Sequence, residues 1–163
     1  MKNYHSEKIA RHIVAALEKM RREDGWEIEF PEGHVMRWDN RKESFAAIPR
    51  AIVTILNSPF RVASHAMERT LRIRIAVWPE KPHKDDPTST DEAVNLAGEE
   101  VLRAIRLAFD PSSADGQGIQ ATVEDGEISY PVELDESDVW DVANIDLVIA
   151  YAEDYHDPSN VIS

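Results

Sequence analysis

The sequence contains no cysteine among its 163 residues. This absence excludes disulfide bonds, thiolate nucleophiles, cysteine-ligated zinc and iron–sulfur clusters, and it fits a reducing compartment. Long hydrophobic runs are missing too, since no stretch approaches the roughly 18 apolar residues needed to cross a bilayer. The start, Met1 to Lys8, lacks the apolar core of a secretory signal. We therefore expect a cytoplasmic protein with no membrane segment.

Basic residues are missing from the last third of the chain. The protein has 18 Lys+Arg against 31 Asp+Glu, a formal charge of −13. Residues 1–106 hold all 18 basic and 17 acidic side chains, whereas 107–163 hold 14 acidic side chains and no lysine or arginine. This third also contains the apolar Tyr130, Trp140 and 145–151, so we expect it to fold. We expect the acidic side chains of this third to form one face of a folded surface or one half of a self-complementary assembly. A disordered acidic tail is the weaker interpretation.

The length predicts one domain, and two segments have the apolar spacing of helices. Residues 6–23 have apolar side chains at helical intervals, with Ser6 as a plausible N-cap. Residues 89–109 have a continuous apolar stripe, opened by the capping-box pair Ser89 and Glu92. We expect both helices to be amphipathic.

The remaining apolar segments alternate or run continuously, as strands do. Five expected extended segments are Trp26–Phe30, His34–Trp38, Ala51–Leu56, Thr70–Val77 and Ile145–Tyr151. Two more, 119–124 and 128–134, would meet in a hairpin at Asp125-Gly126. The proline-containing stretch Pro79–Asp91 is expected to be an exposed loop. Alternation also places Arg72 and Arg74 on the same side of their strand.

The order of these elements predicts an α+β protein. Helix, strands, helix and strands follow one another without regular βαβ alternation. We expect one domain over 1–163, with two helices packed on a mostly antiparallel or mixed β-sheet and a short C-terminal tail at about 153–163.

Motifs for catalysis or cofactor binding are not found in the sequence. The six histidines are scattered, and Asp110–Gly116 has the wrong residues at the third and fifth positions for a calcium loop. Gly116-Gln-Gly118 lacks the third glycine of a dinucleotide fingerprint. We therefore expect no enzymatic activity, no cofactor and no metal. A carboxylate pair for acid–base chemistry among the acids of 124–141 stays open as an alternative.

The best basic group consists of Arg61, Arg69, Arg72 and Arg74. A net charge of −13 repels a phosphate backbone, so a nucleic-acid-binding regulator is the weaker interpretation. A basic patch on an acidic protein is better suited to an acidic protein surface.

Three segments resemble one known family. They are Ile48-Pro-Arg-Ala-Ile-Val-Thr-Ile55, Glu68-Arg-Thr-Leu-Arg-Ile-Arg-Ile-Ala-Val-Trp-Pro79 and Asp138-Val-Trp-Asp-Val-Ala-Asn-Ile-Asp-Leu-Val-Ile-Ala-Tyr151. Their order and spacing are similar to those of the tail-terminator, or tail-completion, proteins of long-tailed bacteriophages. With both helices included, the resemblance covers about 6–152. The segment 26–47 and the tail 153–163 depart from the smaller members and are expected to contact a sheath or neck protein.

The resemblance implies a structural protein of the virion, located at the head-proximal end of the tail and assembled in the host cytoplasm. Members form hexameric rings that cap the completed tail tube, stop its polymerisation and join it to the head. The implied partners are further copies of the chain, the tail tube protein and the head–tail connector or neck protein. A contractile tail would add a sheath protein, and DNA would pass through the ring without specific binding.

The uneven charge suggests how such a ring could be joined. We expect the basic group to meet acidic residues of a neighbouring subunit, namely Glu133, Asp135, Glu136, Asp138 and Asp141. Alternatively, these acids line the ring's hole and repel passing DNA. A head–tail connector, a minor tail protein and a small carboxylate-using enzyme remain as alternative functions.

Overall fold

The structure is a computed structural model that describes residues 4–37, 48–80, 87–130, 142–157 and 161. Its elements confirm the expected α+β class, with a mixed sheet and two α-helices in the described ranges. In chain order they are α1 (His5–Glu18), the 3₁₀ turn η1 (Arg22–Asp24), β1 (Val35–Arg37), β2 (Arg50–Asn57), β3 (Phe60–Ala63), β4 (Ala66–Trp78), α2 (Pro87–Phe109), β5 (Thr122–Ser129) and β6 (Ala143–Asp154).

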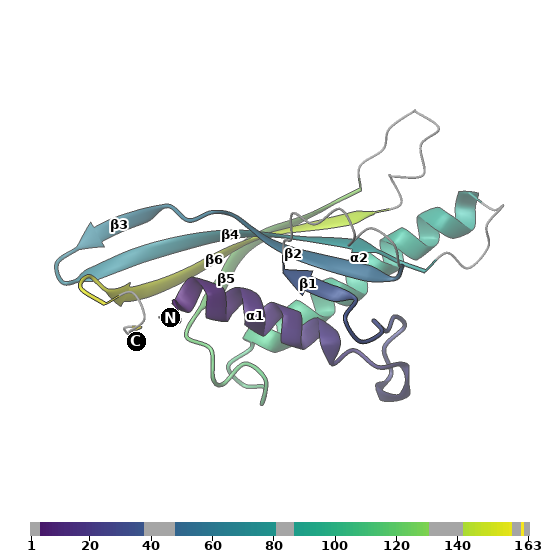
Figure 1. The fold of residues 1–163 in the computed structure, drawn as a ribbon, viewed down its shortest axis with the longest axis horizontal. Helices are drawn as coiled ribbons and strands as arrows, with labels where there is room; N and C mark the ends of the chain where they lie inside the picture. The colour runs from purple at the N-terminus through teal and green to yellow at the C-terminus, as the bar shows by residue number, and fades with distance from the viewer. Residues whose placement is uncertain (1–3, 38–47, 81–86, 131–141, 158–160, 162–163) are drawn as a thin grey trace.

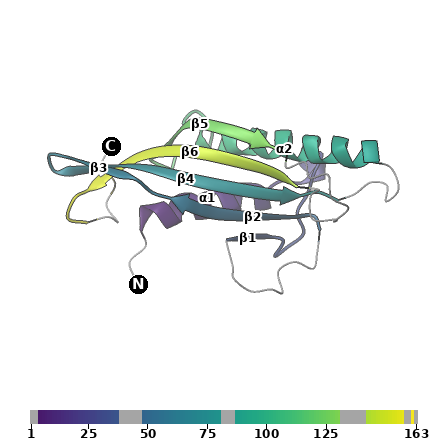
Figure 2. The same cartoon turned by 90° about the horizontal axis from the view of Figure 1, so that it is seen from above.

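The sheet is built around two long strands. Its order is β1-β2-β4-β6-β5, and β3 pairs with the first part of β4, in line with β2 (Figures 1 and 2). Only the β1–β2 pair is parallel in the described sheet. The β4 and β6 strands are paired from Ala66 opposite Asp154 to Val77 opposite Ala143. They therefore form a continuous two-stranded spine that runs the whole length of the sheet.

Both helices cover the same face of the sheet (Figure 1). Alternate side chains of β4 and β6 point to this helix face, and Leu71, Ile73, Ile75, Ile145 and Ile149 have no exposed surface there. The apolar stripes of α1 and α2 complete the core. Burial of each such side chain stabilises the fold by about 1.5–3 kcal/mol. No described helix covers the opposite, outer face.

The N-terminal part differs from the expectation in two places. The first helix begins at His5 and ends at Glu18, and its N-cap is Tyr4, so Ser6 does not cap it. No described strand spans Trp26–Phe30. Its alternation arises because Trp26 and Phe30 pack against the core while the Glu27 N–H donates to the Glu100 carboxylate over 3.0 Å. One-sided packing against α2 thus imitates the pattern of a paired strand.

Three other expectations were wrong. Asp125-Gly126 does not form a hairpin, because β5 runs straight through it alongside β6, with a bulge between Val123 and Asp125. The second helix begins at Pro87, so Ser89 lies inside its first turn and not at its N-cap. Helical residues 87–91 likewise replace the end of the expected loop.

The turn after α2 depends on a glycine. A Cβ at Gly116 would lie 1.9 Å from the carbonyl oxygen of Asp110, whereas a Cβ at Gly118 would meet nothing within 4 Å. The Asp110 carboxylate also accepts hydrogen bonds from the Ser112 N–H and hydroxyl, at 2.9 and 2.7 Å. The chain therefore folds back tightly on itself before β5.

Candidate assembly surfaces

The predicted basic group is divided between two faces of the sheet. Arg72 and Arg74 are exposed on the outer face, as their alternation predicts. Arg61 also points to this face, because it pairs with Glu68, and its side chain is 81% exposed. Arg69 is the exception, since its register places it on the helix face. The five predicted acidic partners, Glu133, Asp135, Glu136, Asp138 and Asp141, lie outside the described residues.

Arg74 already has a partner within the chain. Its guanidinium donates two hydrogen bonds to the Asp146 carboxylate, at 2.8 and 3.0 Å. These bonds raise the pKa of Arg74. The neighbouring Arg72 has no ion-pair partner within the described part of the chain. Of the two, Arg72 is therefore the freer to contact another protein.

One end of the sheet projects beyond the helices as an arm. We define the arm as 58–69, which includes β3, together with 151–154 at the end of β6. It extends past the N-terminus of α1 in Figure 1. A two-residue turn at Ser64 and His65 closes it, with Ser64 at a left-handed φ of 57°. The Tyr155 N–H donates to the His65 carbonyl over 3.0 Å and ties β6 to the tip.

A buried ion pair joins the two long strands within the arm. Arg69 donates to the Glu153 carboxylate over 2.6 Å, and the Glu153 side chain is only 2% exposed. The same guanidinium also donates to the Ser58 hydroxyl over 3.1 Å. Tyr151 lies between Arg69 and the ring of His5, 5.9 Å from the guanidinium and 5.1 Å from the imidazole. The ion pair therefore holds β4 and β6 together inside the arm, and the contact of Tyr151 with His5 links the arm to α1.

The arm displays apolar side chains that nothing described covers. Phe60 is 63% exposed and Val62 is 51% exposed, the two highest values among the large apolar side chains of the described residues. Both pair with helix-face residues of β4, but α1 begins too far along the sheet to cover them. They also belong to an edge strand, whose free side can attract another chain. This surface is typical of an interaction site.

A groove runs along the opposite edge of the sheet, between α2 and β5. Its volume is about 590 Å³, within the range of roughly 300–1,000 Å³ typical of binding pockets. The apolar lining residues are Leu102, Ile105, Phe109, Val123, Ile128, Ile145 and Leu147. Acidic residues along the groove are Asp110, Glu124, Asp125 and Glu127, of which Asp125 and Glu127 have outer-face positions on β5, and Arg106 is the one basic residue of the described lining.

Two glycines shape this groove. A Cβ at Gly98 would lie 3.0 Å from the Tyr130 hydroxyl and 3.2 Å from Ile128, so its absence lets α2 approach β5 closely at that end. Gly126 has a helix-face position on β5, opposite Leu147, and contributes no side chain to the space beyond. The helix and strand are therefore close at Gly98 and separated further along.

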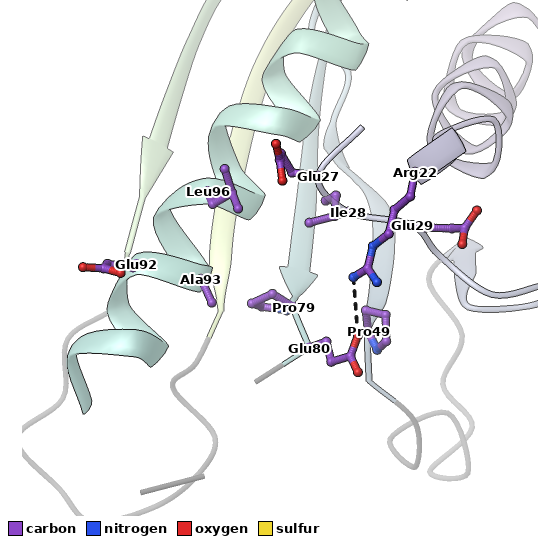
Figure 3. A pocket seen from close by; sticks show the side chains of 10 residues that line it. All are labelled: Arg22, Glu27, Ile28, Glu29, Pro49, Pro79, Glu80, Glu92, Ala93 and Leu96. Atoms are coloured by element: carbon purple, nitrogen blue, oxygen red, sulfur yellow. Dashed lines mark ion pairs between the residues drawn. The ribbon is translucent and has the colours of Figure 1, made fainter. Parts of the chain in front are cut away.

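A second cavity, of about 300 Å³, lies near the start of α2 (Figure 3). Its lining contains Glu27, Glu29, Glu80 and Glu92, and Arg22 forms an ion pair with Glu80 at 3.6 Å. The carboxylates of Glu29 and Glu92 lie on opposite sides of the cavity and point away from each other (Figure 3). These two carboxylates are therefore not placed together for acid–base chemistry.

The described residues contain no group of three or more His, Asp or Glu side chains that could hold a metal ion. In the same residues no helix is long and apolar enough to span a membrane. No protein-family model matches the chain, and no curated protein sequence is significantly similar to it.

The arm and the groove are the surfaces that sequence reasoning missed. A signal for the arm was present, since Phe60-Arg-Val62 alternates between Pro59 and the turn at Ser64. The groove had no comparable signal, because it depends on how α2 crosses the sheet.

Proposed function

We propose that this chain is a phage assembly protein of the tail-terminator kind. It forms a ring, hexameric in the resembling family, on the end of the tail tube. There it ends tube polymerisation and joins the tail to the head or neck. The protein would then belong to the virion, with DNA passing through the ring.

The observation that carries the proposal is the uncovered apolar arm. A protein that acts alone gains nothing from displaying Phe60 and Val62 on the edge strand of an arm whose β4 and β6 strands are joined by a buried ion pair. In an assembly, a rigid arm loses little conformational entropy on docking. The arm therefore favours a structural role in a repeated assembly.

The three resembling segments support the same proposal through their arrangement. They contain most of β2, β4 and β6, which are adjacent strands of the sheet. Segments separated by many residues in the sequence thus form one structural unit. A match of order and spacing is more informative when the matching pieces pair with one another.

Removal of the protein from the phage that encodes it tests the proposal. Electron microscopy should then show tail tubes of irregular, excessive length and heads that carry no tails. Tubes of normal length with unattached heads would instead assign the chain to the head–tail connector. Normal infectious particles would contradict both functions.

A further inference from the structure

The two edges of the sheet differ in a way that suits head-to-tail contact. The arm ends one edge in β3, and β5 forms the other edge of the sheet (Figure 2). The groove lies beside β5. The strands β4 and β6 separate them, which places β3 and β5 roughly 15 Å apart across the sheet. One chain's arm therefore cannot enter its own groove, but it can meet the groove of a second copy.

On the helix face of the sheet, both the β3 edge and the β5 edge carry apolar side chains. On the arm, Phe60 and Val62 point to this side. On the other edge, Val123 and Ile128 point to the same side and line the groove. Two sheets placed edge to edge, with their helices on one common side, would bring these apolar surfaces together.

The outer-face side of the two edges is charged, with opposite signs. Arg61 points outward from β3, where it forms an exposed ion pair with Glu68 at 3.7 Å, and Asp125 and Glu127 point outward from β5. Neither acid forms an ion pair within the described residues. The segment 107–163 has no lysine or arginine that could neutralise them. The same edge-to-edge placement therefore matches charge on the outer side while it matches apolar surface on the helix side.

We infer that the β3 edge of one copy docks along the β5 edge and into the α2–β5 groove of the next copy. Phe60 and Val62 enter the groove, and Arg61 faces Asp125 and Glu127. Such a joint is heterologous, so its repetition closes into a ring when the rotation between copies allows it. The inference rests on the proposed function, and it identifies the surfaces that join the ring.

Cysteine cross-linking tests this joint cleanly because the natural chain has no cysteine. Val62→Cys and Val123→Cys replace one small apolar side chain with another. A mixture of these two single variants, treated with a short bismaleimide, should give cross-linked dimers, and the double variant should give a ladder ending at the ring size. The matched control pairs Val62→Cys with Leu107→Cys, which is 42% exposed on α2 but does not line the groove. The control pair should not cross-link.

Affinity measurements test the two halves of the joint separately. Phe60→Ser should raise the dissociation constant of the joint at least about tenfold, because an aromatic anchor is lost. Arg61→Glu should raise it about two- to five-fold, as expected for an exposed ion pair. Glu127→Lys should have a similar effect, and the combination of both reversals should restore assembly. Urea unfolding midpoints measured at protein concentrations too low for assembly should stay unchanged, which separates assembly from folding.

The outcomes distinguish this inference from the proposed function. A wild-type ring without a Val62–Val123 cross-link would overturn the joint and leave the proposed function intact. Symmetric cross-linking of Val62→Cys alone would also overturn it, since that requires a two-fold contact. Cross-linked open fibres without rings would support the joint and contradict the ring. Failure of the wild-type chain to associate at any concentration would contradict both.

Discussion

Removal of Arg69 is expected to destabilise the fold far more than removal of the exposed Arg74. Arg69→Met leaves the Glu153 carboxylate, 2% exposed, without its charged partner. Breaking a buried ion pair in this way costs about 3–5 kcal/mol, against a total stability of about 5–15 kcal/mol for a typical domain. The variant should remain folded but lose a large share of its free energy of unfolding.

The reverse change should be milder. Glu153→Gln leaves Arg69, whose side chain is 20% exposed and can be partly hydrated, and the amide oxygen can still accept its hydrogen bond. We expect a loss of about 1–3 kcal/mol. The double variant Arg69→Met/Glu153→Leu removes both charges and should recover most of the loss, because an apolar pair can replace a buried ion pair.

Urea unfolding followed by tryptophan fluorescence measures these differences at one fixed protein concentration. Arg74→Met is the matched control, since its bidentate pair with Asp146 is exposed and should contribute at most about 1 kcal/mol. A loss below about 1 kcal/mol for Arg69→Met would refute the reasoning. So would a double variant as unstable as Arg69→Met alone.

Three further predictions concern pH, a turn and the outer face. Burial lowers the pKa of His5, so the unfolded chain takes up a proton on this imidazole at a higher pH than the folded chain does. The free energy of unfolding should therefore fall as the pH drops from about 7 to about 5, and His5→Gln should flatten that dependence in urea titrations. Gly116→Ala should cost about 1–3 kcal/mol in thermal or urea unfolding because its Cβ collides with backbone, whereas Gly118→Ala should stay within about 0.5 kcal/mol. Arg72→Glu combined with Arg74→Glu should lower the assembled fraction in sedimentation velocity; an unchanged fraction would exclude Arg72 and Arg74 from the subunit contacts.

The sequence predicted those elements whose pattern arises directly from burial. The alternation in 70–77 and 145–151 and the stripe in 89–109 reflect one buried face each, so β4, β6 and α2 were found. The prediction of a strand at Trp26–Phe30 was wrong because a segment that packs on one side only shows the same alternation as a strand. The prediction of a hairpin at Asp125-Gly126 was wrong because pairing with β6 overrides the local preference for a turn.

The candidate site was predicted only in part. Alternation placed Arg72 and Arg74 together on one face, and the structure agrees. The same alternation, followed two residues earlier, puts Arg69 in line with Leu71 on the buried face, and Glu153 continues the buried face of β6. Their pairing needed the strand register, which is a tertiary property. The absence of lysine and arginine from 107–163 indicated that the β5 edge is acidic. It did not indicate which surface of another copy that edge would contact.

The mass and shape of the purified wild-type protein test the central claim most directly. Native mass measurement with negative-stain electron microscopy should show one closed species at six times the 18.5 kDa mass of the chain, with a sixfold ring in projection. Higher salt should weaken it, because exposed charge pairs contribute to each joint. A monomer that persists at all concentrations would contradict the ring, and with it the proposed roles of the arm and the groove.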